Sequence, residues 1–220
     1  MIFNKVDKII CVSNLLAQRI IQDYPDIKTK IIVIYNNIDK PIDHMTPKKI
    51  NNQIMSTGGS SPLKNNIQVC DAISKLNKTR RDKEKIKYII VGKKHNNITF
   101  SKYSFVEYYG EISHERCMKI MEESNLYIQN SAFETFNMSI IEAIGRGCKI
   151  LTGKDTGALE VISGLNENNI IRNHNDIHEI ANKINVIMNS SKQKTTVRWE
   201  LLDKESVKRQ FLTAADLINE

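Results

Sequence analysis

The sequence predicts an α/β protein with a doubly wound parallel sheet and helices at its C-terminal end. Short apolar runs rich in β-branched residues alternate with stretches whose apolar residues have a helical period, most regularly between residues 53 and 195. Alternating strands and helices form βαβ units, whose right-handed crossovers make the strands parallel. With 220 residues, 40% of them hydrophobic, the chain can bury a substantial core.

The sequence of residues 1–40 predicts a strand, a helix and a second strand. An apolar run over 6–12 is followed by Ser13, which stands where an N-cap belongs, and then by apolar residues at helical spacing over 15–21. The run KIIVIY over 30–35 is β-branched and nearly continuous, which is typical of a strand covered on both faces. This region therefore forms a segment of its own ahead of the main domain.

A connector over 41–52 separates this segment from the main domain, since it contains two prolines and shows no apolar period. The main domain is expected to span 53–195, and residues 196–220 predict a C-terminal helix. The strands are expected at 54–57, 87–91, 105–109, 126–129 and 149–152, and the helices at 63–76, 114–123, 138–144, 177–188 and about 200–218.

The sequence favours a cytoplasmic protein. Its longest apolar runs are far shorter than the roughly 20 residues that a membrane-spanning helix needs. Charged residues interrupt the N-terminal apolar run where a secretory signal would be continuous. The four cysteines stand far apart and lack C-x-x-C or histidine pairing, so we expect reduced, mostly buried thiols and no metal site.

The formal net charge is +7, with a pI near 9.1. Such a charge is compatible with nucleic acid, an anionic membrane surface or an anionic small substrate. The lysines are scattered among acidic residues, and few aromatic residues alternate with them as a base-stacking surface would need. We therefore expect no nucleic-acid partner. A solvated lysine-rich surface and peripheral association with the inner face of a membrane both stay open.

The first of two chemically informative loops is MSTGGSSPLK, residues 55–64. Gly58 and Gly59 permit positive φ, Ser60 offers a hydroxyl, and Lys64 lies at the start of the next helix. Exposed amides, a helix N-terminus and a cation predict an anion site, most naturally for phosphate, where ligands of a doubly wound sheet bind. An ordinary Gly-Ser turn is the alternative, because neither the P-loop nor the dinucleotide-binding pattern is present.

The second loop and its helix read SAFETFNMSIIEAIGRG. Glu134 is expected to project from the loop toward a ligand, while Asn137 or Ser139 caps the helix and free amides near Met138 and Ser139 face an anion. Glu142 follows about a turn into that helix. A solvated charge at the first glutamate and a structural carboxylate at the second stay open. A glycosidase pair is disfavoured, because carboxylates this close in sequence are better placed along one ligand than across one bond.

With these residues the sequence resembles the retaining GT-B glycosyltransferases of family 4, specifically their C-terminal, donor-binding half. The resemblance covers most of the chain, and its most specific element is the pair Glu134 and Glu142, separated by seven residues. The other matching segments, in the family's order, are VDKIICVSN (6–14), KIIVIYNNID (30–39), the loop 55–64, KYIIVG (87–92), VEYYGEIS (106–113) and TGALEVI (156–162).

The resemblance implies a Rossmann-like domain that binds a nucleotide-diphosphate sugar for transfer with retention of configuration, without a metal or other cofactor. Lys64 matches the lysine that binds the donor diphosphate, and Glu134 matches the glutamate that contacts sugar hydroxyls; these are the expected catalytic residues. Glu142 matches the glutamate that bonds the ribose. The other expected substrate-binding residues are Gly58, Gly59 and Ser60 in the first loop, Glu111 and Ile112 along the nucleobase, and Thr135, Phe136, Asn137, Met138 and Ser139 around the sugar and distal phosphate.

The sequence departs from the family in both loops. The family has an arginine at the position of Gly59 and a glycine at that of Asn65. Its Gly-Phe-Gly after the first glutamate is Thr135-Phe136-Asn137 here. These changes remove one diphosphate contact and narrow the room for the sugar.

The resemblance begins at the hinge of the family's two-domain fold, so residues 1–40 are expected to lie beside that hinge. The N-terminal acceptor domain is then expected to be either a further part of the same polypeptide or a separate partner. A non-catalytic nucleotide-sugar-binding module or subunit that needs this partner is the alternative to an enzyme. Polysaccharide biosynthesis is the setting that the resemblance implies.

Overall fold

The computed structural model describes residues 5–41, 49–95, 99–191 and 194–215. Its centre is a six-stranded sheet in which every pair of neighbouring strands is parallel, with the order β5-β4-β3-β6-β7-β9. This confirms the doubly wound α/β architecture that the alternating pattern predicts. The strands are β3 (Ile50–Thr57), β4 (Lys87–Val91), β5 (Val106–Gly110), β6 (Ser124–Gln129), β7 (Lys149–Gly153) and β9 (Ile170–Ile171).

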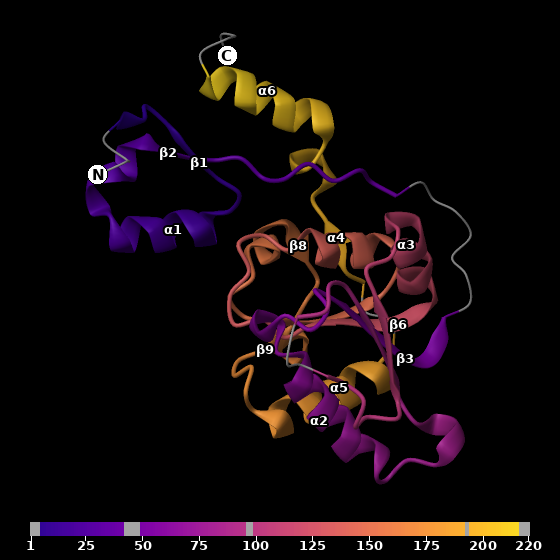
Figure 1. Ribbon diagram of the computed structural model, residues 1–220. Coiled ribbons are helices and arrows are strands. Elements are labelled where there is room, and N and C mark those ends of the chain that lie inside the picture. Colours follow the sequence, from indigo (N-terminus) through magenta and orange to yellow (C-terminus); the bar gives the residue numbers. More distant parts are fainter. Residues whose placement is uncertain (1–4, 42–48, 96–98, 192–193, 216–220) are drawn as a thin grey trace.

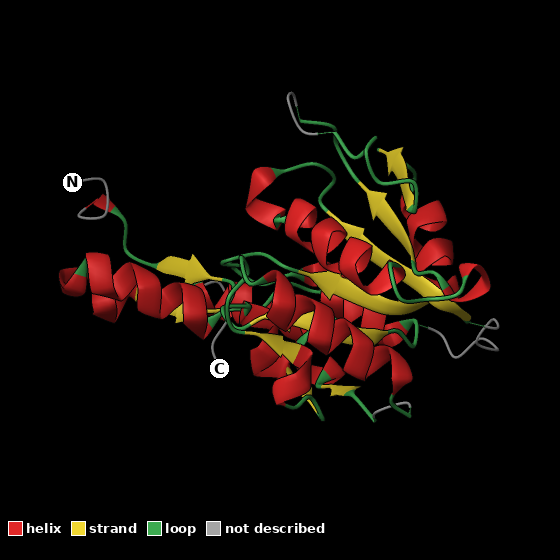
Figure 2. Ribbon diagram, turned by 90° about the horizontal axis from the view of Figure 1, so that it is seen from below, coloured by secondary structure: helices red, strands yellow, loops and turns green. Residues whose placement is uncertain are grey.

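Helices cover both faces of this sheet (Figures 1 and 2). Helices α2 (Asn66–Asn77) and α5 (Ile177–Asn189) pack on one face, and α3 (His114–Glu123) and α4 (Met138–Gly145) pack on the other. Each helix buries its apolar stripe against the strands, which gives the sheet one hydrophobic cluster on each side.

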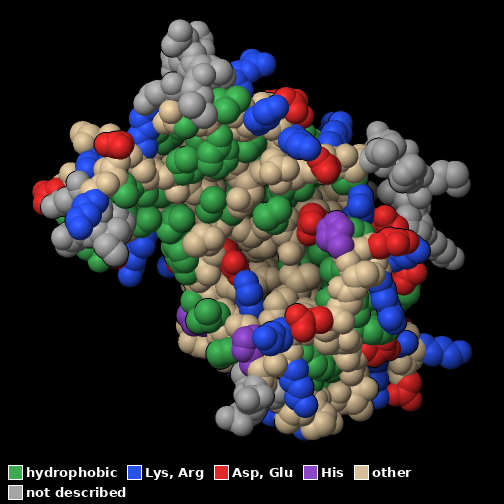
Figure 3. Space-filling model, turned by 45° about the horizontal axis from the view of Figure 1, so that its top comes forward, with side chains coloured by type: hydrophobic (Ala, Val, Ile, Leu, Met, Phe, Trp, Pro, Cys, Tyr) green, Lys and Arg blue, Asp and Glu red, His purple; other side chains and the backbone are tan. Residues whose placement is uncertain are grey.

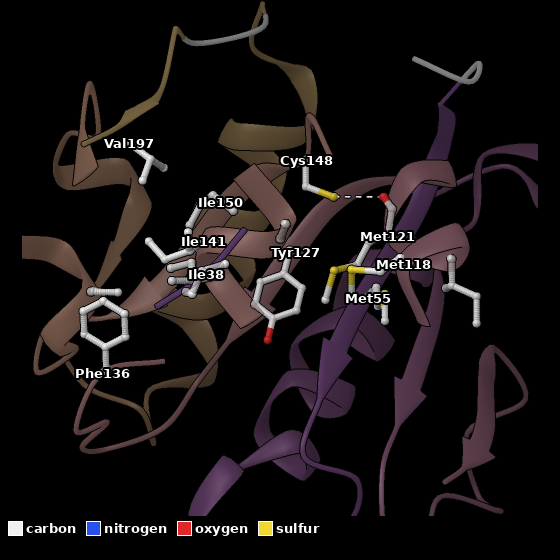
Figure 4. Packing of buried hydrophobic residues seen from close by; sticks show 14 of the residues in the cluster. Ile38, Met55, Met118, Met121, Tyr127, Phe136, Ile141, Cys148, Ile150 and Val197 are labelled. Atoms are coloured by element: carbon white, nitrogen blue, oxygen red, sulfur yellow. Dashed lines mark hydrogen bonds between the residues drawn. The ribbon is translucent and has the colours of Figure 1, made fainter. Parts of the chain in front are cut away.

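Successive strand residues alternate between the two clusters. Ile54 of β3 and Leu126 and Ile128 of β6 belong to the cluster under α2 and α5, whereas Met55 and Tyr127 belong to the one under α3 and α4. Figure 4 shows the second cluster, where these two side chains lie near Met118, Met121 and Ile141. Buried residues on both sides explain why the strands have continuous apolar sequences rather than alternating ones.

The N-terminal segment consists of β1 (Ile9–Cys11), α1 (Asn14–Asp23) and β2 (Ile31–Val33). The Ser13 side chain accepts a hydrogen bond from the Leu16 amide, so the predicted N-cap is confirmed. The two strands pair in parallel and form a two-stranded sheet of their own. The expectation that 30–35 is covered on both faces is wrong for β2, whose three residues are half-buried, because so small a sheet buries little.

The structure departs most from the sequence prediction in the C-terminal region, where a single helix over about 200–218 was expected. A 3-10 turn (Trp199–Leu201) is followed by α6 (Lys204–Ala214), whose N-cap Asp203 interrupts the helix. Residues 216–218 lie outside the described residues. Val207 and Ala214 of α6 pack with Ile34, so α6 lies beside the N-terminal segment, away from the main sheet (Figure 1).

Three short strands and several element boundaries also differ from the expectations. The pair β8 (Ile162–Ser163) and β10 (Thr196–Val197) is antiparallel, and neither it nor β9 is expected from the sequence. Strand β3 begins at Ile50, inside the expected connector, of which residues 42–48 lie outside the described residues. A 3-10 turn (Pro62–Lys64) precedes α2 and delays its start. None of the described helices is both long and apolar enough to cross a membrane.

Candidate functional site

The two informative loops meet at the carboxyl ends of β3 and β6, which are neighbours in the sheet. Lys64 Nζ lies 2.5 Å from Glu134 Oε1, so a cation from one loop is paired with a carboxylate from the other. The Lys64 side chain is 27% exposed and that of Glu134 is 13% exposed. The pair is therefore accessible from solvent yet partly shielded from it, which strengthens its interaction with an incoming charge.

Gly58 and Gly59 stand where neighbouring parts of the chain come too close to leave room for a side chain. Their φ angles are +94° and +59°. A Cβ atom at Gly58 would lie 2.7 Å from Cγ of Lys64, and one at Gly59 would lie 2.2 Å from the Lys93 carbonyl oxygen. The first glycine lets the lysine side chain lie across the loop, and the second lets the loop pack on the turn after β4.

The expectation of exposed amides in this loop is wrong for Gly59 and Ser60. The Gly59 amide donates to the Val91 carbonyl (2.9 Å), and the Ser60 amide donates to the Lys93 carbonyl (3.2 Å). The Ser60 hydroxyl is buried and accepts from the His95 amide at 2.6 Å. The positive φ angles of Gly58 and Gly59 turn these groups toward the neighbouring loop, so Lys64 is the charged group that this loop presents to an anion.

Backbone hydrogen bonds fix the loop that carries Glu134. The Glu134 amide donates to the Asp155 carbonyl, and the Glu134 carbonyl accepts from the Gly157 amide. The Ser13 hydroxyl donates to the Thr135 carbonyl at 2.5 Å. Phe136 is 1% exposed and packs against the Tyr35 ring, so only its backbone can contact a ligand.

Asn137 occupies the N-cap position of α4, with φ of +82°. Its side chain makes no capping hydrogen bond, and Ser139 is the second residue of the helix, so neither of the two expected side chains caps α4. The amides of Met138 and Ser139 donate to no residue in the described parts of the chain, as expected for the first turn of a helix. These free amides carry the positive end of the helix dipole, which favours an anion at this point.

Glu142 lies on α4, where its Oε1 is 3.0 Å from His114 Nε2 of α3. Burial, and then the charge of Glu142, raise the pKa of the nearby Cys117 thiol to about 11. Glu142 and His114 line a pocket of about 460 Å³, a volume suited to a small molecule. The other lining residues are Asn37, Ile38, Asp39, Lys40, Pro41, Met118, Glu122, Met138 and Arg146.

Lys64 and Glu134 do not line this pocket, which reaches the first turn of α4 at Met138. Glu111 is exposed and follows Gly110 at the end of β5, while Ile112 packs against the core; neither lines the pocket. The space-filling view shows charged side chains of both signs around a hollow on this face (Figure 3). The structure thus presents an ion pair, a helix N-terminus and a pocket along one surface.

Sequence reasoning missed the polar groups beneath Glu134. Gln129, 3% exposed, donates from Nε2 to Glu134 Oε1 at 3.0 Å and accepts from the Tyr127 hydroxyl at 3.1 Å. The signal was a glutamine at the end of an otherwise apolar strand. His114 was missed as well, since nothing in the sequence relates it to Glu142.

The parallel sheet, with loops that lead into helices at the carboxyl ends of its strands, defines the Rossmann-like class of α/β domains. Residues 43–200 match the family described as glycosyl transferases group 1, and the chain belongs to that family. No curated protein sequence is significantly similar to it.

Solved structures of glycosyltransferases share the fold. HepE from Anabaena, in complex with UDP and glucose, superimposes with a TM-score of 0.74 over 97% of this chain and 64% of its own, at 17% identity. Sucrose-phosphate synthase from Thermosynechococcus elongatus gives 0.72 over 96% and 58%, at 14% identity. WaaG, a glycosyltransferase involved in lipopolysaccharide biosynthesis, gives 0.67 over 92% and 57%, at 13% identity. The chain spans less than two thirds of the length of each of these proteins.

Proposed function

We propose that this chain binds a nucleotide-diphosphate sugar and forms the donor-binding half of a retaining glycosyltransferase of family 4. The observation that carries the proposal is the Lys64–Glu134 pair, 2.5 Å apart, on the same surface as the free amides that begin α4. A cation and a helix N-terminus bind a diphosphate, and a carboxylate accepts hydrogen bonds from sugar hydroxyls. A nucleotide-diphosphate sugar contains both the diphosphate and the sugar hydroxyls in one molecule.

Donor binding exchanges the partners of the ion pair. Lys64 moves to the diphosphate, whose distal phosphate also accepts from the backbone of residues 135–139 at the start of α4. Glu134 then accepts from hydroxyls of the sugar. Because Lys64 keeps an anionic partner throughout, its charge is never left unpaired during this exchange.

The ribose lies at the pocket of about 460 Å³ beside α3 and α4, and the nucleobase extends beyond the residues that line it. Glu142 accepts from the ribose hydroxyls after exchanging its contact with His114 for them. The nucleobase lies along the backbone of Glu111 and Ile112. Glu134 and Glu142 therefore hold two sugars of one extended ligand, with the diphosphate between them.

The chemical step breaks the anomeric C–O bond of the donor and leaves a nucleoside diphosphate. Lys64 and the α4 amides stabilise the negative charge that develops on the leaving phosphate. An acceptor hydroxyl attacks the same face of the sugar, and its proton goes to the leaving phosphate oxygen. Removing one preorganised donor of this kind raises the barrier by about 2.7–4 kcal/mol. The step as proposed requires no metal.

The acceptor is bound by a second half, joined to this chain covalently or supplied as a separate polypeptide. Support comes from the greater length of the structures that share the fold, of which this chain covers 57–64% in the three compared. The proposal places the protein in the cytoplasm, in polysaccharide biosynthesis. Its net charge of +7 supports association with an anionic membrane surface on the inner face.

A non-catalytic nucleotide-sugar-binding subunit is the second candidate, and Gly59 favours it. The family's arginine would stand at this position, where a Cβ would lie 2.2 Å from the Lys93 carbonyl oxygen and φ is +59°. The loop in this conformation cannot accept a larger residue, so the diphosphate has one cation fewer than in the family. With one cation fewer, the charge that develops on the leaving phosphate is stabilised less, which lowers the rate of transfer. The affinity for the nucleoside, which lies away from the diphosphate, changes less.

Calorimetric titration with UDP-glucose, GDP-glucose and ADP-glucose tests the proposal. We expect saturable binding of at least one, and Lys64→Ala and Glu142→Ala should each weaken it at least tenfold, the loss expected for a charge-assisted contact. Lys87→Ala is the matched control, because Lys87 is an exposed lysine at the opposite end of the sheet. No binding of any of the three at millimolar concentration would refute the proposal.

Transfer assays separate the two candidates. The chain combined with an acceptor-binding half should release nucleoside diphosphate and form glycoside if it is the catalytic donor half. Donor binding without hydrolysis or transfer, even with that half present, would assign the chain to the non-catalytic class.

A further inference from the structure

A chain of hydrogen-bonded polar groups, buried from Tyr127 onward, leads from β3 to the proposed sugar-binding carboxylate. The Thr57 hydroxyl is 2.7 Å from the Tyr127 hydroxyl, which lies 3.1 Å from Gln129 Oε1. Gln129 Nε2 donates to Ser131 Oγ at 2.8 Å and to Glu134 Oε1 at 3.0 Å. Tyr127 is fully buried, and Gln129 and Ser131 are each 3% exposed.

Glutamine suits this place because its side chain is both an acceptor and a donor. The carbonyl faces the tyrosine hydroxyl, and the amino group faces the carboxylate. The reverse orientation would place the Gln129 carbonyl 3.0 Å from a carboxylate oxygen, an unfavourable contact between two acceptors. Burial raises the pKa of Tyr127 further above its ordinary value, so its hydroxyl is protonated at neutral pH and can donate.

Both hydrogen bonds to the Glu134 carboxylate end on Oε1, one from Lys64 and one from Gln129. Oε2 accepts none from the described residues, so it is the oxygen available to a ligand. The two donors differ in their surroundings: Lys64 has a long, 27% exposed side chain at the end of a short 3-10 turn, whereas Gln129 is 3% exposed and is the last residue of β6, a central strand.

We infer that Gln129 is a positioning residue, which holds the Glu134 carboxylate in place for the donor sugar after Lys64 has moved to the diphosphate. The inference rests on the proposed function. Tyr127 and Thr57 act one step further back, because they fix which end of the Gln129 carboxamide faces Glu134. Gln129 itself touches no substrate.

Comparing a sugar nucleotide with its free nucleoside diphosphate tests this role. Calorimetry with UDP-glucose and UDP, or with the GDP or ADP pair if the protein prefers that base, gives two dissociation constants for each variant. Gln129→Leu should weaken sugar-nucleotide binding about tenfold, the size expected for one hydrogen bond to a charged group, and should change the nucleoside diphosphate less than twofold.

Gln53→Leu is the matched control. Gln53 is also a buried glutamine, 5% exposed, but it donates to Ser124 Oγ near the amino ends of the strands. It should leave both dissociation constants unchanged. Tyr127→Phe keeps the ring and removes only the hydroxyl, so it tests the same chain of bonds if Gln129→Leu does not fold. It should weaken the sugar nucleotide about threefold, again without an effect on the nucleoside diphosphate.

Equal losses for the two ligands would mean that Gln129 only supports the fold, and would overturn the inference, as would unchanged affinities. In either case the unsubstituted protein would still bind the sugar nucleotide, so the proposed function would stand. If the unsubstituted protein bound neither ligand, the proposed function and the inference would fall together.

Discussion

Asn65 and Asn137 have left-handed backbone conformations, with φ of +49° and +82°. They are the two non-glycine residues with positive φ in the described parts of the chain, and both stand where the family resemblance places glycine. Asparagine is the residue that, after glycine, most readily adopts this conformation. Both loops therefore keep the backbone conformation of a glycine-containing loop. Gly59 differs, because it stands where the family has an arginine and so lacks the guanidinium group.

Substitutions at Asn65 separate its backbone from its side chain. Asn65→Ala should destabilise the protein by about 1–2 kcal/mol, because alanine resists the left-handed conformation. Asn65→Gly loses the same hydrogen bond from Nδ2 to the Asn130 carbonyl but meets no such resistance. Urea unfolding should therefore find the glycine variant about 1 kcal/mol more stable than the alanine variant. Equal stabilities would show that φ at this position is not what selects asparagine.

At the scale of elements, α5 is fastened to the loop after β9 by Glu179. This carboxylate accepts from the amides of Arg172 and Asn173 at 2.8 and 2.9 Å and pairs with Lys183 at 3.0 Å. Burial by itself would raise the pKa of Glu179, but these bonds outweigh burial and lower it. The ionised form is therefore the one that stabilises the native state.

The lowered pKa of Glu179 determines how its contribution to the stability of the protein changes with pH. Glu179 contributes stability at pH values above the ordinary glutamate pKa of about 4.3, and this contribution is lost as the pH falls through the lower native value. Glu179→Gln should thus be less stable than the unsubstituted protein by a constant amount from pH 6 to 8. The difference should shrink steadily below about pH 4.3. A difference that grew in acid would contradict the assignment.

Long, strongly periodic elements were predictable from the sequence, and short or interrupted ones were not. The bounds of α3 and β4 match the expectation, because each is bordered by clear polar or capping residues. The strands β8, β9 and β10 have two residues each, too few to show a period. The start of α2 was misplaced because Asn65, in its left-handed conformation, ends the turn containing Pro62 before the helix begins.

At the scale of the whole molecule, the N-terminal segment is docked on the loop that carries Glu134 and on the 3-10 turn Gly157–Val161. The Glu160 carboxylate accepts from the amides of Asn14 and Leu15, the first residues of α1, at 2.9 and 2.7 Å. The Ser13 hydroxyl reaches the Thr135 carbonyl at 2.5 Å. These partners lie more than 120 positions apart in the sequence, and no local pattern indicates them. The same holds for Gln129, whose role depends on which groups the fold brings together.

Removing the Glu160 carboxylate should loosen this docking. Glu160→Gln keeps the size of the side chain but loses the charge that offsets the dipole at the start of α1. Hydrogen exchange of α1 amides should become about tenfold faster, the effect of roughly 1.4 kcal/mol, while amides of α5 exchange at their former rate. Uniform acceleration across both helices would indicate a general loss of stability instead.

The most direct measurement of the central claim is a map of backbone amide shifts by nuclear magnetic resonance. The 25.3 kDa chain would be titrated with the sugar nucleotide that binds in calorimetry. The account predicts the largest shifts at the free amides of Met138 and Ser139 and around Lys64, Glu134 and Glu142. Shifts confined to the opposite, amino-terminal ends of the strands, or none at millimolar ligand, would contradict it.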